Sequence, residues 1–464
     1  MAFTPTAAVV LLSTLALGVQ SNYPTGTHAE STAAFQPGIA ARTPQPPQEH
    51  PKLTLERINA GIPWPRGIAF VDGKIVVVAR GRHRNFGGPA QDFEDHAGQL
   101  YLVDPSISEP YSAGAVPSER ILANQEVLAE PDPKVVHLFD RSRAPLENPL
   151  MNRPYCTLKY DPLSRNVVFC AYSGVDMTEK PHFRKNATDA IYRFDLRTKQ
   201  WGIVELHRDD VVPAAARGAV ISNEYCPHHD PKKSPAPHGF LNGPNGCAVV
   251  GRWLYAVGKD NHTLARYDLA PVREDPAAKA PPAELVLGER IQVRMDGQVQ
   301  TISMLGHSAV CADSQWLYLG SRSSSIVLRF PIDAEGALVT PIVGELLAEF
   351  EPFDPATERS ADIWDMEVDR EGLLYVSCAR EGRVWRFEPD PARPFDGNDF
   401  RKESPTPNKP YLDMPRLTGV KGARISNMAF DEQNRMVFCA TFKESHTDRA
   451  GGIFRVIEQE AEAK

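Results

Sequence analysis

Six segments of the chain share one pattern of hydrophobic and polar positions. Each has a small or polar residue, a short apolar run, a turn, a second β-rich run, a loop and then a third strand. The first runs begin at Gly67, Thr157, Gly246, Ser308, Asp365 and Asn427. Because a regularly recurring pattern is typical of repeat architectures, we expect six copies of one small β unit.

The third strand of the unit carries the sharpest signal. In five of the six copies an arginine stands between apolar or aromatic residues, at Arg193, Arg266, Arg329, Arg386 and Arg455. The exception is Tyr101–Val103. An apolar–polar–apolar alternation has the period of two that a half-buried strand requires, so each of these segments is predicted to be a strand.

A single small antiparallel sheet cannot bury both of its faces, whereas sheets packed around an axis can. Outer, fourth strands are expected at segments such as Gly202–Glu205 and Glu345–Ala348. The last copy ends at its third strand near Ile457, so we expect Leu53–Leu55 to supply its fourth strand. The sequence therefore predicts an all-β fold: a six-bladed β-propeller of four-stranded antiparallel blades, closed by an N-terminal strand. A seventh blade between residues 105 and 149 is the alternative.

The beginning of the chain is typical of an exported protein. The apolar run Ala7–Val19 is too short to span a bilayer comfortably, and Val19 and Ser21 suit the small-residue positions of a signal-peptide cleavage site. We therefore expect cleavage near Ser21, a secreted or periplasmic protein, and no transmembrane segment in the mature chain. The expected organisation is a signal peptide at 1–21, a flexible Pro-rich leader at 22–51, the propeller domain at 52–458 and a tail at 459–464.

Charge and cysteine content exclude some classes of protein. The formal net charge of −8 argues against a nucleic-acid or anionic-membrane partner, since both reward clustered positive charge. Seven cysteines leave at least one thiol free, so a disulfide framework is not expected. Cys170, Cys378 and Cys439 stand at equivalent places in three copies and are expected to be buried.

The repeats resemble a known group of propellers. Gly243–Gly246 (Gly-Pro-Asn-Gly) before a first strand, then Leu254–Tyr255 and Ala265–Tyr267, are similar to NHL-repeat and gluconolactonase-type propellers. Paraoxonases and strictosidine-synthase-like proteins share that architecture, and the resemblance covers about residues 52–457. It implies that the loops entering the inner strands, and those joining strands two and three, lie on the face where the family binds ligands.

The residues that enter the inner strands are the candidate site. The inner strands of a propeller surround an axial channel. We expect the ligand-binding residues at the mouth of this channel to be Arg66, Asn245, His307, Trp364, Asp365 and Asn427. Three of them, Asn245, Asp365 and Asn427, supply the oxygen ligands that Ca²⁺ prefers. The resemblance likewise implies a divalent metal held by carboxylate and Asn ligands.

Two of these residues point to different chemistry. His307 is the candidate general base, with pocket lining as the alternative. Arg66 stands where the family usually has a glutamate ligand. Its guanidinium cannot coordinate a metal and instead suits an anionic ligand such as a carboxylate.

Two further features lie in loops of the same face. The first is the loop Cys226–Asp230, in which His228 and His229, together with His238, offer ligands for Zn or Cu. The alternative is that this Pro- and Lys-rich loop is simply solvent-exposed surface. Long loops in the first, second and sixth copies add positive charge from Arg80, Arg82, His83, Arg84, His182, Arg184, Lys443 and His446.

Two functions fit this pattern. The first is an exported propeller that binds a small or anionic ligand at the channel mouth, or a protein partner on the loop-rich face, as a scaffold or partner-binding module. The alternative is a Ca²⁺-dependent lactonase or esterase-type hydrolase, in which the ion polarises a carbonyl and His307 helps to activate water. Whether the protein is an enzyme stays open at this point.

Overall fold

The computed structural model describes the chain from residue 45 to residue 459 with gaps. The described residues are 45–46, 50–79, 99–129, 154–172, 188–208, 243–259, 262–275, 283–295, 297–350, 361–397, 408–443 and 450–459. The expected signal peptide, most of the leader and the end of the tail lie outside them.

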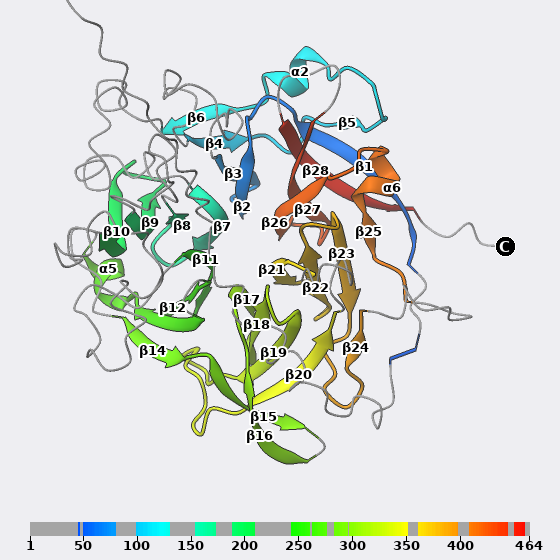
Figure 1. Cartoon of the computed structure of the whole chain (residues 1–464). Coiled ribbons are helices and arrows are strands. Elements are labelled where there is room, and N and C mark those ends of the chain that lie inside the picture. The colour runs from blue at the N-terminus through cyan, green and yellow to red at the C-terminus, as the bar shows by residue number, and fades with distance from the viewer. Residues whose placement is uncertain are drawn as a thin grey trace, which may run out of the picture. The chain divides into compact units, whose positions relative to one another are not determined.

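The described strands form six sheets (Figure 1). One contains β2 (Pro65–Val71), β3 (Lys74–Ala79), β4 (Gln99–Val103) and β6 (Glu126–Ala129). The next contains β7 (Pro154–Asp161), β8 (Asn166–Tyr172), β9 (Thr188–Asp195) and β10 (Trp201–Arg208). The third contains β11 (Pro244–Val250), β12 (Trp253–Gly258), β13 (Thr263–Asp268) and β14 (Glu284–Leu287).

The other three sheets follow the same plan with additions. The fourth contains β17 (His307–Ala312), β18 (Trp316–Ser321), β19 (Ile326–Pro331), β20 (Gly344–Glu349), the hairpin β15 (Arg290–Met295) and β16 (Gln298–Ser303), and β24 (Phe395–Asp396). The fifth contains β21 (Ile363–Val368), β22 (Leu374–Cys378), β23 (Arg383–Phe387) and β25 (Leu412–Asp413). The last contains β26 (Arg424–Phe430), β27 (Met436–Lys443), β28 (Ala450–Gln459), β1 (Lys52–Asn59) and β5 (Glu109–Pro110). Short helices are α2 (Glu119–Leu122), α5 (Ala270–Glu274) and α6 (Met414–Thr418).

The first strands of the six sheets adjoin one another in a closed order. β2 contacts β7, and contacts follow from β7 to β11, β17, β21 and β26, which in turn contacts β2 (Figure 1). Within each sheet the consecutive strands of the repeat pair antiparallel. The chain is therefore an all-β propeller built of small antiparallel sheets, as the sequence predicts.

The two ends of the described chain meet in one sheet. β1 pairs antiparallel with β28, with Lys52 opposite Gln459 and Glu56 opposite Arg455. The segment Leu53–Leu55, which the sequence assigns to the missing outer strand, lies within β1. In the described part of residues 105–149, β5 and β6 join sheets that already exist rather than forming another.

The core lies between adjoining sheets. Val76 and Val78 of β3, for example, pack in one cluster with Phe169 of β8 and Tyr192 of β9, all essentially inaccessible to solvent. Burying such side chains contributes about 1.5–3 kcal/mol each. The cysteines predicted to be buried, at positions 170, 378 and 439, are buried.

The repeated arginines of the third strands stabilise the sheets. Arg266 Nε lies 2.8 Å from a carboxylate oxygen of Glu284, and Arg329 Nε lies 2.9 Å from that of Glu345. In each case the glutamate stands directly opposite on the outer strand. In these two sheets, the alternation that identified the third strand also places a charge where an outer-strand carboxylate pairs with it.

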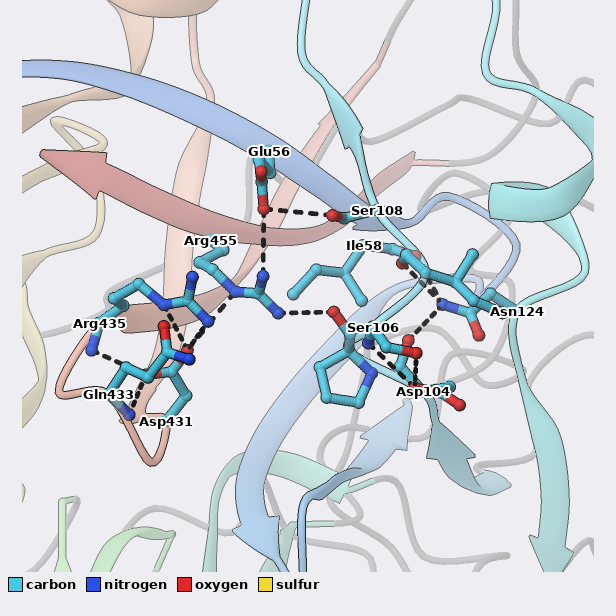
Figure 2. A network of polar contacts seen from close by, with 12 residues as sticks. Glu56, Ile58, Asp104, Ser106, Ser108, Asn124, Asp431, Gln433, Arg435 and Arg455 are labelled. Carbon is cyan, nitrogen blue, oxygen red and sulfur yellow. Dashed lines mark hydrogen bonds and ion pairs between the residues drawn. The ribbon is translucent and has the colours of Figure 1, made fainter. Parts of the chain in front are cut away.

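Arg455 of β28 extends the same arrangement to a neighbouring sheet (Figure 2). Its side chain is 8% exposed, and its guanidinium donates to Glu56 of β1 at 3.1 Å and to the carbonyl of Pro105 at 2.6 Å. Asp431 lies 3.5 Å from its Nε and also accepts from Arg435. One buried guanidinium thus joins β1, β28 and the turn after β4.

Among the residues that the structure describes, no helix has the length and apolar character needed to cross a bilayer.

Candidate functional site at the start of the inner strands

Every inner strand changes register near its beginning. The pairing of β2, β7, β11, β17, β21 and β26 with the second strand of its sheet contains an irregularity there. In β2 the shift falls at Arg66 and in β21 at Trp364, two of the predicted site residues. A bulge bends the strand and re-aims the side chain it carries, so these positions face differently from regular strand residues.

The backbone just before two of these bulges is left-handed. Trp64 has a φ of 51° and Asp362 a φ of 61°. This conformation is uncommon for side chains other than glycine and costs on the order of 1–3 kcal/mol. Such strain is concentrated at functional sites, which directs attention to the entries of β2 and β21.

The predicted ligand Asn245 bonds to the next sheet. Its Nδ2 donates to the carbonyl of Ser308 at 2.7 Å, and its own carbonyl accepts from Thr157 Oγ1 at 3.1 Å. Ser308 Oγ in turn donates to the carbonyl of Ile363 at 2.7 Å. These polar side chains therefore connect four consecutive inner strands, from β7 to β21.

Asp365 and Asn427 are brought together, as the sequence expects. Asp365 Oδ2 accepts from Asn427 Nδ2 and from the backbone N–H of Met428, both at 2.7 Å. Asn427 Oδ1 accepts from the N–H of Ile68 at 2.7 Å. Burial raises the pKa of Asp365, while the charge of Lys159 and these hydrogen bonds oppose the rise. The pair thus connects β21, β26 and β2.

This arrangement does not fit a calcium site formed by Asn245, Asp365 and Asn427. Ca²⁺ takes six to eight oxygen ligands. The side-chain oxygen of Asn427 is occupied by a backbone N–H, and Asn245 bonds toward β17 rather than toward Asp365. Within the described ranges, no group of three or more His, Cys, Asp or Glu side chains is placed to hold a metal ion.

A charged pair that the sequence analysis missed crosses the axis instead. Lys159 of β7 forms an ion pair with Glu367 of β21, and these strands lie three places apart in the ring of six inner strands, on opposite sides. The signal was present in the repeats. The third residue of the six first runs is Ala69, Lys159, Ala248, Val310, Glu367 and Ala429, so two opposite charges stand among small apolar residues.

His307, the predicted general base, is completely buried. Burial, with the nearby His262, lowers its pKa to about 3. The backbone of Thr263 and Met304 opposes this shift only in part. The imidazole is therefore neutral and poorly basic at neutral pH, whereas an efficient base has a pKa near the working pH.

Arginine and tryptophan occur together at the entries of β2 and β21. Arg66 is buried, with its guanidinium carbon 5.6 Å from the ring centre of Trp64. The guanidinium carbon of Arg322, which follows β18, lies 5.3 Å from the ring centre of the largely buried Trp364. Both distances are in the range of a cation–π contact.

Two arginines share one buried carboxylate beside Trp364. Arg322 forms an ion pair with Asp362, and Arg380, which follows β22, lies 3.3 Å from the other oxygen of that carboxylate. Asp362 is 3% exposed, while the two arginine side chains are 23% and 30% exposed. Sequence reasoning singled out neither arginine, although it expected the loops that join strands two and three to lie on the same face as the inner-strand entries.

The remaining candidates lie outside the described residues. These are the possible Zn or Cu ligands His228, His229 and His238. The same holds for the side chains of the basic loop residues Arg80, Arg82, His83, Arg84, His182, Arg184, Lys443 and His446.

Comparison with known proteins yields likenesses only at the level of structure. No family model matches the chain, and no curated protein matches it. A calcium-binding protein, regucalcin, from Agrobacterium tumefaciens strain C58 is 11% identical over 86% of this chain and 92% of its own, with a TM-score of 0.39. A gluconolactonase from Xanthomonas campestris is 15% identical over 91% and 98%, with a TM-score of 0.38.

A virginiamycin B lyase from Staphylococcus aureus is 9% identical over 87% of this chain and 99% of its own, with a TM-score of 0.36. We draw no functional conclusion from likenesses of this degree. The fold rests on the sheets themselves.

Proposed function

We propose that this protein is an exported six-bladed β-propeller, closed by β1 as its last outer strand, that binds a small anionic ligand on the face where the inner strands begin. The observation that carries the binding role is the pair of partly exposed guanidinium groups, Arg322 and Arg380, around the single buried carboxylate of Asp362.

The charge balance of this group favours an anion. Two arginines and one aspartate leave one net positive charge, and the two cationic groups are the exposed ones. A guanidinium offers paired N–H donors that match a carboxylate or a phosphate. The ring of Trp364 beside Arg322 restricts the guanidinium.

Binding can be tested with simple anions and single substitutions. We expect a panel of mono- and dicarboxylates and inorganic phosphate, compared at constant ionic strength, to include a compound that binds the wild type in calorimetry. Arg322→Gln and Arg380→Gln should each weaken that binding by about tenfold or more, because a hydrogen bond to a charged group contributes about 1.5–3 kcal/mol.

Arg252→Gln is the matched control. Arg252 is an exposed arginine that pairs with Asp268 near the turn between β11 and β12, away from the inner-strand entries. Its substitution should leave binding unchanged. Unaltered binding in both Arg322→Gln and Arg380→Gln would refute this site.

Export is tested separately. We expect the N-terminus of the mature protein to lie close to Asn22, and an N-terminus at Met1 would contradict export.

The described residues do not favour the calcium-dependent hydrolase. Its expected ligands bond between sheets, and its expected base His307 is buried. Calcium-dependent hydrolysis of lactones or aryl esters that disappears in Asn245→Ala, while this variant still folds, would reverse that preference.

A further inference from the structure

The axis of the propeller contains a lysine that faces carboxylates. Lys159 and Glu367 pair across the ring, and their side chains are only 14% and 19% exposed. They belong to β7 and β21, which are not neighbours in the order of inner strands around the ring. This ion pair therefore connects two sheets between which the described residues form no backbone hydrogen bond.

A second carboxylate lies on the same strand. Asp365 stands two positions before Glu367 on β21, so their side chains project to the same side of the strand. Asp365 is 1% exposed, and the charge of Lys159 favours its ionised form against the effect of burial. One ammonium group thus pairs with Glu367 and opposes the rise in the pKa of Asp365, in a region that water reaches poorly.

We propose that Lys159 is the built-in counter-ion of the axial carboxylates Asp365 and Glu367, and that it takes between opposite sheets the role that a divalent cation could otherwise fill. This goes beyond the proposed ligand binding, which concerns the face of the propeller and not its axis. A tethered ammonium cannot be removed by a chelator, and it leaves the inner strands connected in the absence of any metal.

The physical argument rests on the cost of unpaired charge. Removing one partner of a buried ion pair leaves a desolvated charge behind, which is more costly than never having had the pair. Without the ammonium, Glu367 would keep an uncompensated charge on the same strand as Asp365, and ionising both carboxylates would be more costly. A hard divalent cation, which prefers oxygen ligands, would then be the group best able to compensate that charge.

The test compares thermal unfolding of wild type and Lys159→Gln in chelator and in millimolar calcium chloride, at equal ionic strength. We expect the wild-type Tm to be the same in both. We expect Lys159→Gln to melt about 3–6 °C lower in chelator and to recover part of that loss in calcium. The double variant Lys159→Gln/Glu367→Gln should lose the response to calcium.

Lys74→Gln serves as the control, since Lys74 pairs with Asp104 but its side chain is 43% exposed. Its Tm should change little. A Tm of Lys159→Gln equal to that of this control, or a wild-type Tm that falls in chelator, would overturn the proposal.

If Lys159→Gln does not fold, the double variant decides. A folded double variant supports the role of Lys159 as counter-ion, because neutralising Glu367 then removes the need for the ammonium. A double variant that also fails to fold, with calcium or without, would overturn it.

Discussion

Replacing Arg455 by methionine should weaken the sheet that contains both ends of the described chain. The Arg455 side chain is 8% exposed, and its guanidinium pairs with Glu56, the carbonyl of Pro105 and Asp431. Methionine keeps much of the apolar stem and its packing but removes the charge and all its donors, so the loss reports mainly on the polar contacts.

The contacts differ in what they contribute. The bond to the Pro105 carbonyl is a charged hydrogen bond, which contributes about 1.5–3 kcal/mol. Glu56 is 31% exposed, so its pairing is worth about 0–1 kcal/mol after screening by solvent. Asp431 keeps its bond to Arg435 and is not left unpaired. We therefore expect the free energy of unfolding to fall by about 2–4 kcal/mol.

Urea unfolding followed by tryptophan fluorescence and far-UV circular dichroism measures this loss. The matched variant is Arg266→Met, whose arginine occupies the same repeat position but is 22% exposed and pairs with a glutamate that is 57% exposed. That variant should lose about 1 kcal/mol. The reasoning fails if Arg455→Met loses no more stability than Arg266→Met.

Two further predictions concern the inner and outer parts of the sheets. Because the pKa of His307 is lowered to about 3 from an ordinary 6.5, the unfolded chain binds an extra proton between these values. The contribution of the neutral His307 to stability is therefore fully present above about pH 6.5 and is lost as the pH falls toward 3, so His307→Gln should show a smaller fall in Tm between pH 7 and pH 4.5. A slope identical to wild type would contradict this. Gly251→Ala should destabilise strongly, since a Cβ there would lie 2.1 Å from the carbonyl oxygen of Glu335 at a φ of 54°. Gly297 has a φ of 77° and open space around it, so Gly297→Ala should lose only the about 1–2 kcal/mol that a left-handed backbone costs a residue with a side chain. Equal losses of unfolding free energy for the two glycine variants in urea would exclude the predicted clash at Gly251.

Much of the fold could be predicted because a local alternation of apolar and polar residues identifies strands. The second run Ile75–Ala79 lies in β3, Gly202–Glu205 lies in β10 and Glu345–Ala348 lies in β20. The position of Leu53–Leu55 in β1 followed from counting strands, since the last repeat has three of its own. None of these conclusions needed the direction of a particular side chain.

The candidate site depended on such directions, and there the sequence was less informative. The bulges at the start of the inner strands decide whether a polar side chain faces the axis or a neighbouring strand, and a shift of one residue changes the face. Asn245 and Asn427 therefore bond between sheets, although their residue types suit a metal. Asp362 is paired by arginines from two loops, and its position follows only from the packing of adjacent sheets.

The opposite charges of Lys159 and Glu367 were visible in the aligned repeats. Their meeting was not, because it requires knowing that the second and fifth sheets face each other across the ring.

The pairing of β1 with β28 also determines when the molecule can finish folding. Lys52 and Gln459 are paired although about 400 positions separate them, so closing the loop between them costs about 5 kcal/mol of chain entropy. Contacts so distant in sequence make folding slow, and the last sheet cannot form until the end of the chain has been synthesised. Until then β1 presents an unpaired edge, which is a template for aggregation. A chain that stops before β28 is therefore expected to be recognised as incomplete by proteases and chaperones, even though its first five sheets have all of their own strands.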